Sequence, residues 1–355
     1  MKFYYTIFLF ILSNVIFSQI DTSSHVTISG YGELYYSYDF SKPIQNIKPD
    51  FIYNHKRHNE LNVNLMLLKA NYQSGNIDAN FGWMMGNYSQ YNLAAEPIEV
   101  RGIYEATIGI KLSNKNNVRI DAGIMPSHIG FESAVGADCF TLTRSLVAEN
   151  SPYYETGIKL STISKNKKLS ISGLLLNGWQ KIQRTIAEET PSYGLQFQYN
   201  PNSNVLINYS GFYGNNQPDT STNYRFYHNL YTIIEAGKKT KLILSVDYGI
   251  DKKNNSKIFT WVVPTFILKR NFSEKNSVAI RMEYFDDPNN IILKVPNATK
   301  ADIFGSSINF DRKIFNNLLF RIEAKNYYSS EKIFTLNKLP DYNNFSLTTS
   351  LCVKF

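Results

Sequence analysis

Residues 101–126, RGIYEATIGIKLSNKNNVRIDAGIMP, contain the pattern that decides the fold. Apolar and polar side chains alternate with a period of two on both sides of a short turn at 114–116. Successive side chains of a β-strand point to opposite faces, so this alternation predicts two strands joined as a hairpin. One face carries Tyr104, Ala106, Ile108, Ile110, Leu112, Val118, Ile120, Ala122 and Ile124, and the other carries Glu105, Thr107, Gly109, Lys111, Arg119, Asp121 and Gly123.

The same alternation recurs along the chain after Gln19, with almost no helical periodicity. It predicts about 16 strands, within a range of 14 to 18, that start near residues 25, 58, 76, 101, 117, 153, 168, 191, 203, 223, 239, 256, 276, 301, 315 and 344. Short turns are predicted at 74–75, 114–116, 164–167, 201–204, 237–240, 271–276 and 311–316. Mostly longer loops lie between them, at 39–57, 88–100, 127–152, 179–190, 214–222, 251–255, 287–300 and 328–343.

Charged side chains share the less apolar face of these strands. They are Glu33, Asp78, Glu105, Lys111, Arg119, Asp121, Glu155, Lys159, Asp247, Arg281, Glu283, Arg321, Glu323 and Lys325. A soluble sandwich or propeller could not bury such a face. On the lipid side, each Arg or Lys would cost about 2–4 kcal/mol at the membrane midplane. The sequence therefore predicts an all-β protein, a transmembrane antiparallel up-and-down β-barrel whose charged face meets water inside. Its long loops would be extracellular, and its short turns and both termini periplasmic.

The N-terminus is predicted to be a secretory signal peptide, residues 1–18. Lys2 supplies a positive charge, residues 3–17 are mostly apolar, and Ser18 is a small residue at the cleavage point. The alternative, a transmembrane anchor, would need about 20 apolar residues. We therefore predict export and one barrel, residues 19–355, in contact with lipid in the outer membrane of a Gram-negative bacterium. The final Phe355 resembles the terminal aromatic that outer-membrane assembly machinery reads, so this machinery is a predicted partner.

Composition excludes several other classes. Of 355 residues, 43% are hydrophobic, 14% aromatic and 19% charged, which argues against disorder and against a long helical protein. Two cysteines, Cys139 and Cys352, exclude a disulfide scaffold and a Cys-rich zinc site. We expect both thiols to be free, because a bond would require the loop that carries Cys139 to descend most of the barrel.

No catalytic or metal-binding pattern stands out. The five histidines are scattered, and only His55 and His58 have a ligand-like spacing, beside basic residues that favour a plain surface loop. We therefore predict a protein that is not an enzyme and that carries no metal and no cofactor. We do not expect an exported barrel to bind nucleic acid, even though the net charge of the chain is +8.

Loop 127–152, SHIGFESAVGADCFTLTRSLVAENSP, is the longest predicted connection. Solvated loops seldom carry so many apolar residues, and the nearest cover is the barrel interior. We therefore predict that the loop folds inward and narrows the pore. Glu132, Asp138, Arg144 and Glu149 would then face the lumen opposite the wall residue Arg119, as charges that tune ion selectivity at a constriction. The alternative is a short helix packed over the rim.

The segment DAGIMPSHIGFESAVGADCFTLTRSLVAENSPYYETGIKLS at 121–161 resembles the OmpL-like β-barrel porin family. HNELNVNL at 58–65, AAEPIEVRGIYEA at 94–106 and LLLNGWQ at 174–180 resemble the same family. The resemblance extends from about residue 30 to the C-terminus and is sharpest over 121–180. It implies a water-filled outer-membrane barrel, and it brings neither a catalytic motif nor a substrate.

Some strands are less regular. In 61–72 the apolar parity switches between Leu67 and Leu68, which places Lys69 on the apolar face and predicts a β-bulge. Strands 168–178, 223–236 and 256–268 are apolar at both parities, so no register is assigned. Aromatic residues near strand ends predict girdles at the two membrane interfaces. These are Tyr35, Tyr36, Tyr38, Phe40, Tyr153, Tyr154, Trp179, Tyr327, Tyr328 and Phe355.

Three functions fit these observations. The first is a porin for passive diffusion of small hydrophilic solutes. The second is a channel selective for sugars or hydrophobic molecules, and the third is a plugged structural or adhesive barrel. A homo-oligomer is compatible with each. The fourteen lumen charges comprise six basic and eight acidic residues, while the excess of basic residues lies at the short turns. We therefore expect near-neutral to weakly cation-selective permeation.

Overall fold

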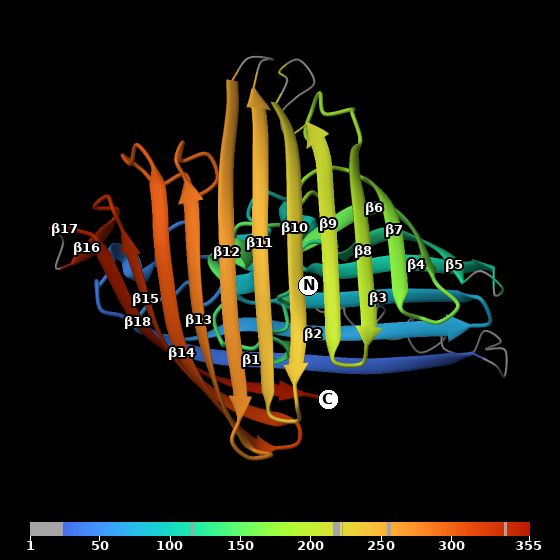
Figure 1. Ribbon diagram of the computed structural model, residues 1–355, viewed down its shortest axis with the longest axis horizontal. Helices are drawn as coiled ribbons and strands as arrows, with labels where there is room; N and C mark the ends of the chain where they lie inside the picture. Colours follow the sequence, from blue (N-terminus) through green and yellow to red (C-terminus); the bar gives the residue numbers. More distant parts are fainter. Residues whose placement is uncertain are drawn as a thin grey trace, which may run out of the picture.

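The computed structural model describes residues 24–113, 115, 117–215, 221, 223–253, 257–336 and 339–355. Sixteen antiparallel strands form a closed barrel in which each strand pairs with its neighbours in sequence and the last strand pairs with the first. In Figure 1, β10–β12 cross the view nearly vertically and β1–β3 nearly horizontally. Strands on opposite walls of a barrel cross in this way because all of them tilt against its axis. The predicted up-and-down barrel of 16 strands is confirmed.

The barrel strands are β1 (His25–Asp39), β2 (Leu61–Ser74), β3 (Ile77–Met85), β4 (Ile103–Ser113), β5 (Val118–Pro126), β6 (Tyr154–Ile163), β7 (Leu169–Leu176), β8 (Ser192–Asn202), β9 (Val205–Asn215), β10 (Asn223–Ala236), β11 (Thr240–Lys253), β12 (Lys257–Asn271), β13 (Asn276–Asp287), β14 (Ala301–Phe315), β15 (Leu318–Ser329) and β18 (Asn343–Lys354). The loops contain the 3₁₀ turns η1 (Ile44–Asn46), η3 (Ile98–Val100) and η4 (Gly136–Asp138), the π-turn η2 (Tyr88–Asn92), the helix α2 (Leu146–Glu149) and the hairpin β16 (Phe334–Leu336) and β17 (Leu339–Asp341).

Every barrel strand starts within three residues of its predicted position, and three connections differ from the prediction. β14 continues to Phe315, so 311–316 is mostly strand, and β11 extends to Lys253 into the loop predicted at 251–255. The loop predicted at 328–343 contains the hairpin β16–β17. The predicted signal peptide, residues 1–18, lies outside the described residues. In the described part of the chain, no helix has the length and hydropathy needed to cross a membrane.

The alternation seen in the sequence corresponds to the two faces of the wall. In β13, Ile280, Met282 and Tyr284 are exposed on the outside, whereas Arg281 and Glu283 are buried inside. All fourteen charges predicted for the lumen are buried or half-buried. The prediction that this whole face meets water is wrong, because protein covers most of these side chains. Those that keep partial exposure include Asp78, Lys111, Arg119 and Lys159.

Two apolar clusters fill much of the lumen and explain the irregular strands. Leu174 and Leu176 of β7, Tyr227 of β10, and Trp261 and Val263 of β12 point inward into one cluster, so these strands are apolar on both faces. Leu65 and Leu67 of β2 point into the other cluster. Lys69 faces inward with them and pairs with Glu105 at 2.9 Å. β2 does contain a bulge, at Asn64 between the paired residues Val63 and Leu65, three residues before the predicted switch.

The same clusters correct half of the predicted aromatic girdle. Tyr35, Tyr153, Tyr154 and Tyr327 are buried inside the barrel, and Trp179 packs against the first cluster. We call the end of the barrel with the long loops the loop end, and the end with the short turns the turn end. The outward aromatic side chains at the loop end, some predicted and some not, are Tyr36, Phe40, Tyr193, Tyr213, Phe226, Tyr248, Tyr284, Phe304, Tyr328 and Phe345. Those exposed at the turn end include Phe272, Phe315 and Phe355. Aromatic rings therefore mark both ends of the wall, as in other outer-membrane barrels.

Candidate functional site

Loop 127–152 leaves β5 and turns into the barrel. Its first turn is fixed by His128, whose Nδ1 lies 2.8 Å from Glu155 Oε2 on β6 and whose Nε2 donates to the Gly211 carbonyl on β9 at 2.9 Å. Two residues later, the Gly130 amide donates to Asn229 Oδ1 on β10 at 3.2 Å. The loop is therefore bonded to β6, β9 and β10 before its central part begins.

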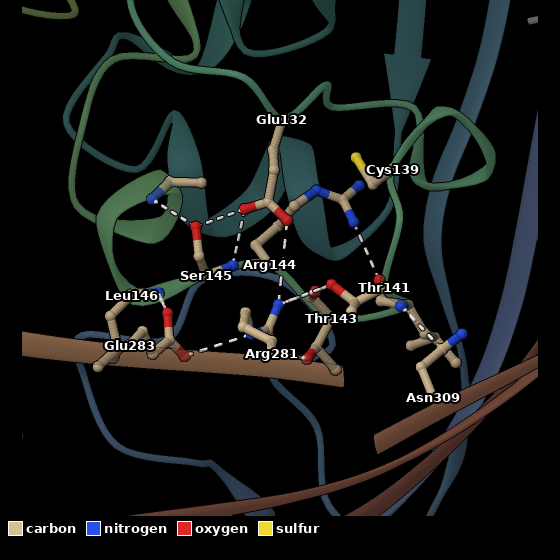
Figure 2. Close-up of polar contacts among 12 residues, drawn as sticks. Glu132, Cys139, Thr141, Thr143, Arg144, Ser145, Leu146, Arg281, Glu283 and Asn309 are labelled. Carbon is tan, nitrogen blue, oxygen red and sulfur yellow. Dashed lines mark hydrogen bonds and ion pairs between the residues drawn. The ribbon is translucent and has the colours of Figure 1, made fainter. Parts of the chain in front are cut away.

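The central part of the loop is held by charged side chains of β13 and β15, and Figure 2 shows the two of β13, Arg281 and Glu283. Arg281 donates to Thr141 Oγ1 at 2.8 Å, to the Thr143 carbonyl at 2.7 Å and to Thr143 Oγ1 at 2.9 Å. Glu283 accepts from the Leu146 amide at 2.6 Å, and Glu323 accepts from the Thr143 amide at 2.5 Å. Hydrogen bonds to charged groups are each worth about 1.5–3 kcal/mol. We call Arg281, Glu283 and Glu323 the clamp.

The tip of the loop reaches the turn end of the barrel. Arg321 on β15 donates to the carbonyls of Gly136 at 2.7 Å and Cys139 at 3.1 Å, and Asp138 pairs with Lys354 near the end of β18. A Cβ at Gly136 would lie 3.0 Å from Glu33 Oε2 on β1, so glycine permits this close approach. The loop therefore does descend most of the barrel, against our expectation.

Both cysteines are nevertheless buried free thiols, as predicted.

Loop 40–60 packs over loop 127–152 at the end of the barrel where the long loops lie. Glu149 accepts from the Tyr53 amide at 2.8 Å and from the Asn54 amide at 3.1 Å. His55 Nε2 lies 3.1 Å from Glu33 Oε1 on β1, so this second loop is also tied to the inner wall. The lumen thus holds two packed loops.

The five residues predicted for the constriction do not form one ring. Glu132 lies 3.9 Å from Arg281 and accepts from the Ser145 amide at 2.7 Å, and burial raises the pKa of its carboxyl above the ordinary value. Arg144 is buried and donates to the carbonyls of Ser133, Ala134 and Leu142. Glu149 is buried under loop 40–60. The side chains of Glu132, Arg144 and Glu149 therefore bond to other protein atoms, and these bonds stabilise the loop.

The other two predicted residues are open to solvent and lie apart. Asp138 is 51% exposed in its pair with Lys354. Arg119, 34% exposed, donates to both oxygens of Asp78 at 2.5 and 2.6 Å and to Asp121 at 2.7 Å. This bidentate arrangement fixes the guanidinium plane against the β3–β5 wall. Arg119 therefore faces Asp78 and Asp121, and the wall residue opposite Glu132 is Arg281.

The clamp was missed as a unit by sequence reasoning. Its members were predicted to face the lumen, but Arg281 and Glu323 are 42 positions apart, Thr143 lies 138 positions before Arg281, and no local pattern joins them. The predicted helix over the rim also has a counterpart, since residues 146–149 form the four-residue helix α2. Its first amide is bonded to Glu283, so it lies against the inner wall of β13.

Cavities remain beside the packed loops. One of about 250 Å³ is lined by Tyr104, Phe131, Glu132, Tyr153 and Tyr231, between the loop and the wall. Another, of about 400 Å³, lies at the turn end among Lys111, Arg119, Ser161 and Lys167. Among the described residues, no group of three or more His, Cys, Asp and Glu is arranged to hold a metal ion. His55 contacts Glu33, whereas His58 accepts from the Asp39 amide.

A closed 16-strand barrel with an apolar outer face, a charged inner face and a loop bound inside the lumen defines the porin class of outer-membrane channels. The family model described as "Putative beta-barrel porin-2, OmpL-like" matches residues 25–355, so the chain belongs to this family, as the resemblance implied. No curated protein sequence matches the chain.

Three solved structures show the same fold at low identity. The anion-selective porin from Comamonas acidovorans has a TM-score of 0.63 and 8% identity over 94% of this chain and 100% of that chain. The outer-membrane channel DcaP of Acinetobacter baumannii has a TM-score of 0.61 and 9% identity over 95% and 99%. The trimer form of OmpT, an outer-membrane protein of Vibrio cholerae, has a TM-score of 0.56 and 10% identity over 93% and 99%.

Proposed function

We propose that this porin passes small hydrophilic solutes by passive diffusion and carries out no reaction on them. Solutes travel along the β3–β6 wall, while loop 127–152 occupies the side of the lumen next to β13–β15. The observation that carries this proposal is that loop 127–152 covers some of the inward-facing charged side chains and leaves others in contact with solvent. Arg281, Glu283 and Glu323 are buried beneath the loop, whereas Asp78, Lys111, Arg119 and Lys159 keep contact with solvent.

In this proposal the loop is the constriction, and its charges act in two ways. Glu132, Arg144 and Glu149 hold the loop in shape, so they set the pore's size. Arg119 with its two aspartates faces the water path and sets its charge. This arrangement favours ions of one sign only weakly, because Asp78 and Asp121 lie at hydrogen-bond distance from Arg119 and offset its charge.

Single-channel recording of refolded protein in a planar bilayer tests the proposal. An ohmic conductance that persists in both voltage directions is expected. Band migration before and after boiling in detergent verifies that the barrel is folded. If a folded barrel conducts no ions, the loops plug the lumen, and a structural or adhesive role replaces diffusion.

Export and assembly belong to the same proposal. Residues 1–18 direct export, residues 19–355 assemble in the outer membrane in contact with its lipid, and Phe355 is read by the assembly machinery. The exchange of two backbone hydrogen bonds between Phe355 and Gly30, at 2.8 and 3.1 Å, supports a role for this residue in barrel closure as well.

A homo-oligomer, as in the trimer form of the similarly folded Vibrio protein, is the proposed assembly. Native mass measurement of protein extracted from membranes tests it, and a monomer mass would refute it.

A further inference from the structure

The outer wall of the barrel carries a group of cations at the turn end, where β13 begins and β14 ends. Arg312 is an exposed, outward residue of β14, because Asp311 before it points into the lumen and accepts from Arg321 there at 2.7 Å. The Lys313 amide donates to the Lys275 carbonyl at 2.8 Å, so the turn between β12 and β13 lies directly beside the end of β14. We call Arg312, Lys275 and Lys313 the cation patch.

The cation patch has no acidic partner within the protein. In the part of the chain that the structure describes, no ion pair and no side-chain hydrogen bond involves Arg312, Lys275 or Lys313. Of the two carboxylates nearest in sequence, Asp311 faces the lumen, whereas Glu274 is exposed in the turn and forms no ion pair with the described cations. The three cations and the carboxylate of Glu274 together leave a net charge of +2.

Apolar side chains surround the cation patch on the same wall. Phe310 shares the outward face of β14 with Arg312, and Ile314, Phe315 and Phe272 are exposed at the turn end. Arg312 therefore lies between apolar residues along its strand, at the edge of the apolar band. A cation on the lipid side of a barrel is costly near the midplane and is tolerated at the membrane interface, where phosphate groups lie.

We propose that the cation patch binds the phosphate group of an anionic phospholipid whose acyl chains pack on the outer wall of β13 and β14. The planar guanidinium of Arg312 matches two phosphate oxygens, and the two lysines add ammonium donors. The chains would lie on outward residues such as Ile280 and Ile308, which are exposed and directly opposite each other on the two strands. Because the turn end is predicted to be periplasmic, the lipid belongs to the inner leaflet.

Free phosphate has the same acceptor oxygens but no acyl chain. The apolar residues beside the cation patch favour the lipid, since they offer nothing to a hydrated ion. The inference rests on the proposed contact of the barrel with outer-membrane lipid and does not depend on conduction.

Native mass spectrometry of the refolded barrel in detergent micelles tests the site. Phosphatidylglycerol is the probe, and diacylglycerol with the same acyl chains but no phosphate is the matched control lipid. We expect phosphatidylglycerol to remain bound and diacylglycerol to bind at least about tenfold more weakly. The double variant Arg312→Gln/Lys275→Gln should weaken phosphatidylglycerol binding by about tenfold or more, because each basic residue near a lipid surface contributes to the attraction.

Arg270→Gln is the control variant. Arg270 is an exposed cation on the neighbouring strand β12, but its Nη1 donates to Thr240 Oγ1 on β11 at 3.3 Å, on the side of β12 away from the cation patch. Its removal should leave lipid binding unchanged. Equal affinity of the wild type and the double variant, or an equal loss in Arg270→Gln, would overturn the inference.

A competition arm separates the two sources of phosphate. Inorganic phosphate at the concentration of the lipid should not displace phosphatidylglycerol, and full displacement would overturn the assignment to a lipid. Band migration before and after boiling verifies that each variant is folded. A barrel that fails to conduct refutes the diffusion function, whereas the mass spectra still decide whether the cation patch binds lipid.

Discussion

Replacing Arg281 by methionine removes the centre of the clamp and keeps most of the side-chain volume. The substitution deletes three hydrogen bonds to Thr141 and Thr143 and one to Glu323, and it leaves the buried carboxylates of Glu283 and Glu323 without this cation. Breaking a buried pair from one side costs about 3–5 kcal/mol. Because each 1.4 kcal/mol is a factor of ten, docking of the loop should weaken by roughly two to three and a half orders of magnitude.

The assay is single-channel recording of Arg281→Met against the wild type. We expect larger or strongly fluctuating current steps, because the loop leaves the β13–β15 wall for part of the time. Arg270→Met is the matched control, since Arg270 is exposed at the turn end of β12 and should leave the current unchanged.

Thr143→Val, which removes only one hydroxyl acceptor from Arg281, is the milder second variant if Arg281→Met does not fold. Wild-type current level and noise in a folded Arg281→Met barrel would refute the view that the clamp holds a constriction.

Three further predictions concern charge and assembly. Reversal potentials across a salt gradient should show near-neutral to weakly cation-selective permeation. Arg119→Ala should shift the reversal potential further toward cation selectivity, because it leaves the carboxylates of Asp78 and Asp121 without their cation. A strong anion preference of the wild type would contradict this prediction. Burial lowers the pKa of Lys48 and Lys56 from 10.5 to about 8. Since an amine loses its positive charge above its pKa, cation preference should rise between pH 7 and pH 9, and a Lys48→Gln/Lys56→Gln variant should lack this rise. Deleting Phe355 should lower the amount of heat-modifiable barrel in outer-membrane fractions, whereas Phe355→Tyr should restore it; equal amounts for the deletion and the wild type would contradict a role in assembly.

The wall of this barrel was predictable because lipid and lumen impose opposite demands on alternate side chains. In β13 the exposed Met282 lies between the buried Arg281 and Glu283, and the sequence alternates accordingly. The pattern became ambiguous where the lumen itself is apolar, as at Leu174 and Leu176, because both faces of β7 then carry the same kind of residue.

The arrangement inside the lumen was predictable only in outline. Apolar residues in loop 127–152 indicated that protein covers it, and the loop does pack against the inner wall. The partner of each charge was not predictable, because Glu132 meets Arg281 and Glu149 meets the backbone of loop 40–60 only after the barrel closes. Arg119 has its two aspartates on β3 and β5, and this trio is fixed by strand register.

The most direct test of the central claim is the single-channel conductance of a barrel that lacks residues 130–147, measured beside the full chain at the same salt concentration. This deletion removes the part of the loop that is bonded to Arg281, Glu283 and Glu323 and leaves every barrel strand intact. If loop 127–152 is the constriction, the conductance of the deleted form rises well above that of the full chain. An unchanged conductance from a folded, heat-modifiable barrel would contradict the claim and place the narrowest section elsewhere in the lumen.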